Sequence, residues 1–258
     1  MQYKLFIRQK GVRNITLTPQ GEAFILIAEK WKELWLETKD ISPISKNTMF
    51  HISAIDSINS YILSKVYKTF IEENNHIHLV INNLHSQDSY KYVENKLVNL
   101  GFISDDMYSK DVKTVPIFSE KMCFISNTEN NYPNVVHPSN LDCKWEIRLP
   151  WNPEFDKWHN YWFGTTSKSL IIVDKMSILD DFLQIKNSWA IVPFSIGNWL
   201  VKNNKNLQIS ELEEAPPDRI YYYIQHINYK SEYVDKFLRI LQKYLETIPG
   251  IVVLLKYI

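Results

Sequence analysis

Hydrophobic positions along the chain change their spacing at regular intervals, and this pattern predicts alternating strands and helices. Short apolar runs at 48–55, 77–81 and 98–102 are typical of β-strands. Between them, the segments 57–70 and 86–97 repeat their apolar residues every three or four positions, which predicts amphipathic helices. This β-α-β-α-β order indicates a parallel sheet covered by helices.

The alternation continues through the second half of the chain. Further strands are predicted at 115–126 (one or two strands), 145–149, 170–173, 189–192 and 219–225, and further helices at 153–163, 175–183, 194–202 and 232–245. Two α/β lobes of about 90 residues each account for this pattern. In open parallel sheets, ligands bind beyond the carboxyl ends of the strands, so we expect a binding cleft between the lobes. The apolar segment 248–258 is either an extra strand or an aggregation-prone end.

A basic hairpin is predicted at the N-terminus. Apolar residues at 5–7 and 15–17 flank a turn that contains Gly11. The first 18 residues hold no acidic residue and four basic ones, Lys4, Arg8, Lys10 and Arg13. Their charge suits contact with phosphate groups, and a solvated surface hairpin is the alternative.

A long amphipathic helix is predicted to follow the hairpin. Thr18 is a suitable N-cap, Pro19 suits the first helical position, and the pattern extends to about Lys39. The apolar stripe of this helix contains Phe24, Ala28, Trp31 and Trp35. The N-terminal piece offers nothing to cover the stripe, so it is either a dimerisation surface or is buried on its own domain. Residues 40–46 have the composition of a linker.

Composition and motifs narrow the possible classes of function. Basic and acidic residues number 29 each, so any site for nucleic acid must be local. Glycines number six, and the glycine-rich and nucleophile motifs of nucleotide-binding enzymes and hydrolases do not occur. We therefore expect no enzymatic activity, no catalytic residue and no cofactor.

Cysteine use and hydropathy give expectations about metals and location. The sequence has no clustered Cys and His, so we expect no metal site. Cys123 and Cys143 are expected to be reduced core thiols, with a disulfide between them as the alternative. The start of the chain lacks a secretory signal, and the longest apolar run, 251–255, is too short to span a membrane. We expect a cytoplasmic protein with no membrane partner.

Candidate ligand contacts lie where the predicted strands end and helices begin. A helix N-terminus presents free N–H groups and a positive dipole end, which favours anions. Seven side chains at such junctions are candidates: Ser57, His85, Ser86, Phe102, Trp151, Asn152 and Lys175. Ser57 is alternatively a plain N-cap, and Lys175 a solvated residue of a first helical turn. Glu154 and His159 suit acid–base chemistry, but no nucleophile or metal motif accompanies them.

Several of these segments resemble the LysR-type transcriptional regulators. The runs Leu5-Phe6-Ile7-Arg8 and Leu17-Thr18-Pro19-Gln20-Gly21 are similar to the two halves of that family's DNA-binding wing, and the long helix stands where the family has its linker helix. Asn99-Leu100-Gly101-Phe102 is similar to a D-L-G-I strand of the family, with Asn in place of Asp. Residues 189–193 are similar to a late strand that ends in Pro. The resemblance covers residues 4 to about 246.

The resemblance implies an α/β fold of two Rossmann-like subdomains of the periplasmic-binding-protein type. Crossover strands would join the subdomains, and a wing remnant and a long linker helix would precede them. The implied divisions are a wing at 1–18, a linker helix and linker at 19–46, subdomain I at about 47–120 and 219–246, subdomain II at about 121–218, and an apolar tail at 247–258.

The resemblance also implies a function and its partners. A small-molecule effector in the cleft, contacted at positions such as Ser57, would bias lobe closure and relay its binding to DNA-binding subunits. Homodimers or homotetramers are implied, joined through the linker helix. The hairpin residues expected at DNA phosphates are Arg8, Lys10 and Arg13.

One departure from the family leaves other functions open. The chain starts almost at the wing, so we expect the recognition helix of the family to be missing, and DNA is a partner only where a full helix-turn-helix is present. The alternatives are a stand-alone small-ligand-binding protein, an enzyme with an unrecognised site, and a truncated inhibitor that pairs with full-length relatives through the linker helix.

Overall fold

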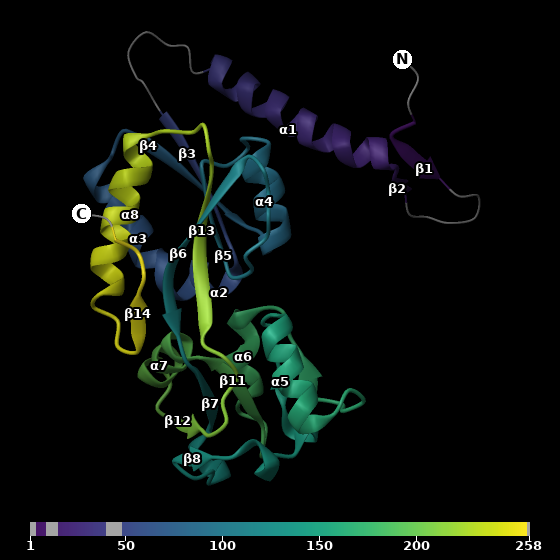
Figure 1. The fold of residues 1–258 in the computed structure, drawn as a ribbon, viewed down its shortest axis with the longest axis vertical. Helices are drawn as coiled ribbons and strands as arrows, with labels where there is room; N and C mark the ends of the chain where they lie inside the picture. The colour runs from purple at the N-terminus through teal and green to yellow at the C-terminus, as the bar shows by residue number, and fades with distance from the viewer. Residues whose placement is uncertain (1–3, 9–14, 40–47, 257–258) are drawn as a thin grey trace.

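A hairpin and a long helix precede two α/β lobes, and the chain returns to the first lobe after it has built the second (Figure 1). The computed structural model describes residues 4–8, 15–39 and 48–256. Strands β1 (Phe6–Arg8) and β2 (Ile15–Leu17) pair antiparallel, as expected. Helix α1 spans Pro19–Lys39, and the Thr18 hydroxyl accepts a hydrogen bond from the Gly21 N–H at 2.9 Å, which confirms Thr18 as the N-cap.

The first lobe is built on a six-stranded sheet with the strand order β14-β6-β13-β5-β3-β4. Its strands are β3 (Thr48–Ala54), β4 (Ile77–Asn83), β5 (Leu100–Ile103), β6 (Val112–Glu120), β13 (Arg219–His226) and β14 (Ile251–Val253). Strand β3 runs parallel to β4 and β5, whereas β13 is antiparallel to both β5 and β6, and β14 is antiparallel to β6. The sheet is therefore mixed, and the prediction of a parallel sheet holds for three of its strands. The apolar tail supplies the edge strand β14.

Three helical segments cover this sheet. The helical run after β3 comprises α2 (Asp56–Ile58), a π-helical turn η1 (Asn59–Leu63) and α3 (Ser64–Glu73). Helices α4 (Ser86–Glu94) and α8 (Glu232–Leu245) complete the set. The predicted capping role of Ser57 is wrong, because the helix begins at Asp56 and Ile55 occupies the N-cap position, two residues before Ser57. The predicted apolar face is buried in the core, with Ile58, Ile62, Val66 and Phe70 each at most 2% exposed.

The second lobe is built on a four-stranded sheet with the order β11-β7-β12-β8. Its strands are β7 (Met122–Asn127), β8 (Val135–Val136), β11 (Trp189–Pro193) and β12 (Leu207–Leu212), and a separate parallel pair is formed by β9 (Ile147–Arg148) and β10 (Ile171–Ile172). Strands β8 and β12 were not predicted.

Helices α5 (Pro153–Phe163), α6 (Leu179–Phe182) and α7 (Phe194–Asn203) pack around this second sheet. Four 3-10 turns also occur: η2 (Thr128–Asn130), η3 (Pro138–Asn140), η4 (Cys143–Trp145) and η5 (Met176–Ile178). The single helix predicted at 175–183 is therefore the turn η5 followed by the short helix α6. The buried core contains Phe124, Trp189 and Leu179.

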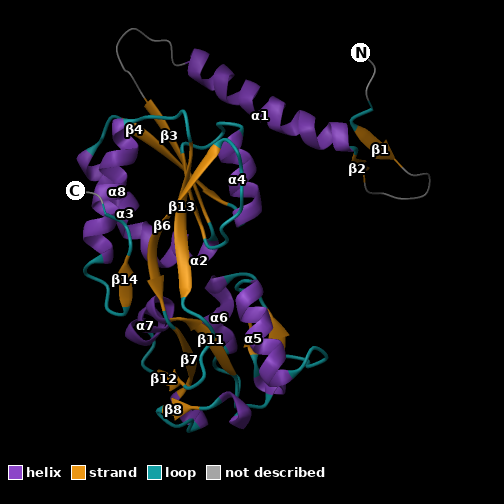
Figure 2. Cartoon of the chain, in the orientation of Figure 1, coloured by secondary structure: helices purple, strands orange, loops and turns teal. Residues whose placement is uncertain are grey.

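The chain crosses between the lobes twice, at neighbouring positions. Strand β6 ends at Glu120 and β7 begins at Met122, while the return crossing leads from β12 into β13. Glu120 and Arg219 are register partners in the ladder of β6 and β13. These two long strands run side by side toward the second lobe (Figure 2). Among the described residues, no helix is long and apolar enough to cross a membrane.

Candidate functional site

A cleft of about 660 Å³ lies between the two lobes. The first lobe lines it with residues 55–57, 85–87 and 104–107, and the second with residues 149–153, Asp156, Val173, Asp174 and Met176, while Arg219 lies at the crossover. This is the position expected from the carboxyl ends of strands β3, β4 and β5.

Five of the seven predicted contact residues line this cleft. Ser57 and Ser86 are buried at its first-lobe wall, and His85 is exposed there. Trp151 and Asn152 belong to the wall of the second lobe. Strand-to-helix junctions that are far apart in the sequence therefore meet at one cleft, as the sequence pattern predicted.

Phe102 and Lys175 do not line the cleft. The Phe102 side chain is fully buried and packs against Phe237, with ring centroids 5.8 Å apart. Alternation along β5 directs this side chain into the core, and only the Phe102 carbonyl reaches the junction, where it accepts from the Ile55 N–H at 3.2 Å. Lys175 is exposed, and its neighbours Asp174 and Met176 face the cleft instead.

Three helix N-termini end at the cleft wall. Residues 55–57 start the helical run of α2, residues 85–87 start α4, and residues 151–153 start α5. The Asn152 side chain caps α5 by accepting from the Phe155 N–H at 2.9 Å. The N-cap residues of α2 and α4, Ile55 and His85, make no side-chain capping bond. The first N–H groups of these two helices therefore have no side-chain acceptor, and the positive ends of the helix dipoles face the cleft.

Two buried charged groups, Arg219 and Glu120, lie at the crossover, and no pattern in the sequence indicates them. The Arg219 side chain is 4% exposed, and its guanidinium carbon lies 4.5 Å from the ring centroid of Trp151. The Arg219 Nε and Nη1 atoms are buried and have no hydrogen-bond partner among the described residues. Glu120 is 1% exposed and accepts from the Ser195 N–H at 2.6 Å and from the Ser195 hydroxyl at 3.0 Å. Burial raises the pKa of Glu120, against the opposing effects of the Ser195 hydrogen bonds and the Arg219 charge.

Acidic side chains surround the cleft. Asp156 pairs with Arg148 at 2.8 Å, and Asp56 accepts from the Met176 N–H at 3.0 Å across the lobes. Asp106 and Asp174 are exposed at the rim. The cleft thus combines a buried cation with an acidic rim.

A family comparison identifies this two-lobed arrangement. The model of the LysR substrate binding domain matches residues 45–246. The chain belongs to the LysR substrate-binding domain family. Comparison with curated proteins gives no match.

Solved LysR-type structures share the fold. Full-length BenM, as a mutant, is 14% identical over 97% of this chain and 85% of that chain, with a TM-score of 0.64. A full-length OxyR mutant from Pseudomonas aeruginosa is 14% identical over 92% and 84%, with a TM-score of 0.62. The BenM effector binding domain with its effector benzoate is 12% identical over 76% and 91%, with a TM-score of 0.61. At these identities the likeness concerns the fold, which is the two-lobed periplasmic-binding-protein type that the LysR resemblance implied.

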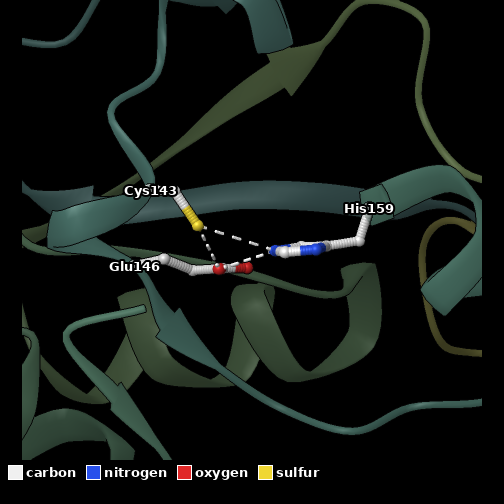
Figure 3. A group of neighbouring side chains, drawn as sticks. All are labelled: Cys143, Glu146 and His159. Carbon is white, nitrogen blue, oxygen red and sulfur yellow. Dashed lines mark hydrogen bonds and ion pairs between the residues drawn. The ribbon is translucent and has the colours of Figure 1, made fainter. Parts of the chain in front are cut away.

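A second polar cluster in this LysR-family domain lies inside the second lobe (Figure 3). The Glu146 Oε2 atom lies 2.8 Å from the His159 Nε2 atom, 3.2 Å from the Cys143 Sγ atom and 2.7 Å from the Ser169 hydroxyl. Glu146 and His159 are at most 1% exposed, and Cys143 is half-buried. The search of the sequence for clustered Cys and His residues missed this cluster. Cys143 and His159 are far apart in the sequence, and the third residue of the cluster is a glutamate.

The three side chains offer donor atoms that Zn²⁺ accepts, but their surroundings favour a structural role. A metal bound at Nε2 requires the His159 Nδ1–H to donate to an acceptor, and among the described residues Nδ1 has no partner. The Ser169 hydroxyl and the Cys143 thiol donate to the Glu146 carboxylate, and the His159 Nε2 atom lies within hydrogen-bond distance of the same oxygen. Both cysteines are free thiols, Cys123 buried and Cys143 half-buried, so the alternative of a disulfide is wrong.

Helix α1 of this LysR-family chain carries the stripe predicted for dimerisation. Phe24, Trp31 and Trp35 are 49%, 73% and 64% exposed, and Ala28 is also exposed. The other side of α1 contacts the first lobe, where Glu29 accepts from the Tyr92 hydroxyl at 3.3 Å and Glu33 lies 3.6 Å from His51. The alternative that the stripe is buried on its own domain is therefore wrong. Of the basic hairpin residues, Lys10 and Arg13 lie outside the described residues, and Arg8 belongs to β1.

Proposed function

We propose that this chain binds a small-molecule effector in the interlobe cleft and, as part of a LysR-type transcriptional regulator, relays that binding through its own assembly. The observation that supports this most directly is that both lobes and the crossover contribute to one cleft of about 660 Å³. That volume suits a small metabolite.

Movement of the lobes is the proposed first response. The lobes are joined by two adjacent crossings, so a ligand that contacts both walls favours the closed arrangement over an open one. To shift the equilibrium, the ligand must bind the closed arrangement more tightly than the open one. The benzoate complex of the BenM effector binding domain, which shares this fold, supports small organic molecules as the ligand class.

Self-association through α1 is the proposed second element. The stripe of Phe24, Ala28, Trp31 and Trp35 points away from the first lobe, and a second copy of the helix would remove it from water. The basic hairpin lies at the far end of the same helix, so assembly through α1 would also fix the spacing of two hairpins. Contacts of Arg8, Lys10 and Arg13 with DNA phosphates belong to this proposal.

A metabolite screen tests the cleft. Gln87 is exposed and lines the cleft, so Gln87→Trp fills its mouth without disturbing the core. We expect ligands that raise the unfolding temperature of the wild type to lose their effect in Gln87→Trp. Lys202→Trp, at an exposed position on α7 outside the cleft, is the matched control and should respond as the wild type does. A ligand that stabilises all three proteins equally would place the site elsewhere.

A further inference from the structure

The buried Arg219 side chain is the least satisfied charged group at the cleft. Its guanidinium is stacked near the rings of Trp151 and Tyr221, at 4.5 Å and 5.2 Å, and both contacts are made by ring faces rather than by acceptor atoms. Its Nε and Nη1 atoms are buried without an acceptor among the described residues. Leaving such donors unpaired is costly in a site removed from water, because a guanidinium remains charged at any physiological pH.

The partner expected for this cation is occupied elsewhere. Glu120 is the register partner of Arg219, yet its carboxylate accepts from the backbone and hydroxyl of Ser195. The two aspartates that line the inner cleft walls are also engaged, Asp56 with the Met176 N–H and Asp156 with Arg148. Arg219 lines the cleft, and its Nε and Nη1 donors are unused but covered, so a ligand can reach them only after the neighbouring side chains shift.

We propose that Arg219 binds the carboxylate of the effector, and that the effector is a small monocarboxylate. This proposal rests on the proposed function, since it names the chemical class of the ligand in the same cleft. A carboxylate would accept charge-assisted hydrogen bonds from the guanidinium, which are about twice as strong as neutral ones. The N-terminus of α4, whose N-cap residue His85 makes no capping bond, adds a favourable field for the same single negative charge.

The rim limits the ligand to one negative charge. Asp105, Asp106 and Asp174 lie around the cleft, and Asp106 and Asp174 are exposed. A second carboxylate or a phosphate dianion that extended from Arg219 toward the rim would meet these like charges, which disfavours its binding. The rest of the ligand is therefore neutral or carries a positive group.

The position of Arg219 also connects ligand binding to lobe movement. Arg219 is the first residue of β13, at the return crossing, and it stacks on Trp151 from the second lobe. A carboxylate bound to Arg219 would therefore contact the crossing between the lobes, where β13 begins. This role could not be predicted from the sequence, because a charged residue that begins an apolar strand is ordinarily a solvated strand end.

Matched ligand pairs test the proposal. Benzoate, hexanoate and glycine would be compared with benzamide, hexanamide and glycinamide, and with the dianions phthalate and succinate, by thermal shift and then calorimetry on the full chain. We expect at least one monocarboxylate to bind, its amide to bind at least tenfold more weakly, and the dianions to give no shift at the same concentration. Arg219→Gln should weaken the monocarboxylate at least tenfold, and Arg219→Lys, which keeps the charge but not the planar fork, by less.

The controls separate a binding role from a structural one. Without ligand, Arg219→Gln loses the ring contacts with Trp151 and Tyr221 and the attraction to Glu120, so its unfolding temperature measures the structural cost of the change. A binding role predicts that Arg219→Lys binds the monocarboxylate more weakly while its affinity for the matching amide stays the same; a purely structural role would lower both affinities. If Arg219→Gln does not fold, the affinity of Arg219→Lys decides. Unchanged carboxylate affinity in the Arg219 variants, equal binding of the amide, or no shift with any monocarboxylate would overturn the proposal.

The same experiment distinguishes a cleft that binds some other ligand from a cleft that binds no effector. A neutral or cationic metabolite that binds the wild type and not Gln87→Trp would leave the cleft as the effector site while removing the carboxylate assignment. A monocarboxylate whose binding depends on Arg219 would support both.

Discussion

Two buried carboxylates in this molecule are stabilised by different neighbours. Glu120 accepts hydrogen bonds from Ser195 beside the cleft, whereas Glu146 accepts from His159 and Ser169 inside the second lobe. Neither arrangement follows from local sequence, because each joins residues that only the folded chain brings together. The sequence did identify Ser57, Ser86 and Trp151 as cleft residues, since strand-to-helix junctions are visible in the hydrophobic pattern.

The cluster around Glu146 predicts the reactivity of Cys143. Burial, and then the neighbouring Glu146 charge, raise the pKa of the Cys143 thiol to about 11. At pH 8 its thiolate fraction is therefore lower than that of an ordinary cysteine by about 100-fold. In a Cys123→Ser background, the alkylation rate of Cys143 with iodoacetamide should rise with pH up to about pH 11.

A matched variant tests the cause of that slow reaction. Glu146→Gln removes the negative charge and should move the midpoint of the alkylation profile toward the ordinary cysteine value. If Cys143 already reacts at pH 8 as fast as a free cysteine, burial and Glu146 do not raise the pKa of its thiol.

Removal of His159 should destabilise the second lobe. His159→Leu would leave the buried Glu146 carboxylate without one of its hydrogen-bond partners, and loss of such a partner costs about 1–3 kcal/mol. Denaturant unfolding should show this loss in the free energy of unfolding. The control is Lys236→Gln, which breaks the exposed pair with Glu232 and should cost less than about 0.5 kcal/mol. A similar small loss in both variants would contradict a stabilising role for the pair.

At the scale of elements, periodicity predicted the long helices best. Helices α1, α5 and α8 span the ranges the pattern indicated, because each has a capping residue and a sustained apolar face. The direction of β6 and β13 could not be predicted, since parallel and antiparallel strands share the same alternation of side chains. Strand β12 was missed because Gln208, Ser210 and Glu211 interrupt its apolar residues.

The exposed stripe of α1 predicts assembly of the chain. Trp31 is 73% exposed and lies on the side of the helix opposite the Glu29 contact with Tyr92. Trp31→Glu places a charge within a stripe that a second helix would bury, and we expect the mass measured by light scattering to fall to that of the monomer. Lys30→Glu, on the same helix outside the stripe, should leave the mass unchanged. A wild type that is already monomeric would contradict the proposed role of α1.

At the scale of the whole molecule, the lobes touch at a few contacts beside the cleft. Tyr61 of the first lobe meets Trp199 of α7 edge to face, with ring centroids 5.0 Å apart. The Tyr61 hydroxyl lies 3.5 Å from the Met176 carbonyl, and burial together with the nearby Asp56 and Asp180 charges raises the Tyr61 pKa to about 12. The hydroxyl therefore remains protonated and can donate at neutral pH. These contacts stabilise the observed arrangement of the two lobes.

Weakening these contacts should open the molecule. An aromatic pair of this kind contributes about 0.5–1.5 kcal/mol, so Trp199→Ala should raise the open population by about 2- to 10-fold. Trp199 is 43% exposed, and its removal leaves the core of the second lobe intact. We expect a larger radius of gyration in small-angle scattering without ligand. Tyr161→Ala, at a 78% exposed position on α5, is the control. Because a ligand that contacts both walls binds the closed arrangement, its affinity should fall in Trp199→Ala by the same factor as the closed population. An unchanged scattering profile together with unchanged affinity would mean that the lobes are held at their present separation by the crossover strands alone.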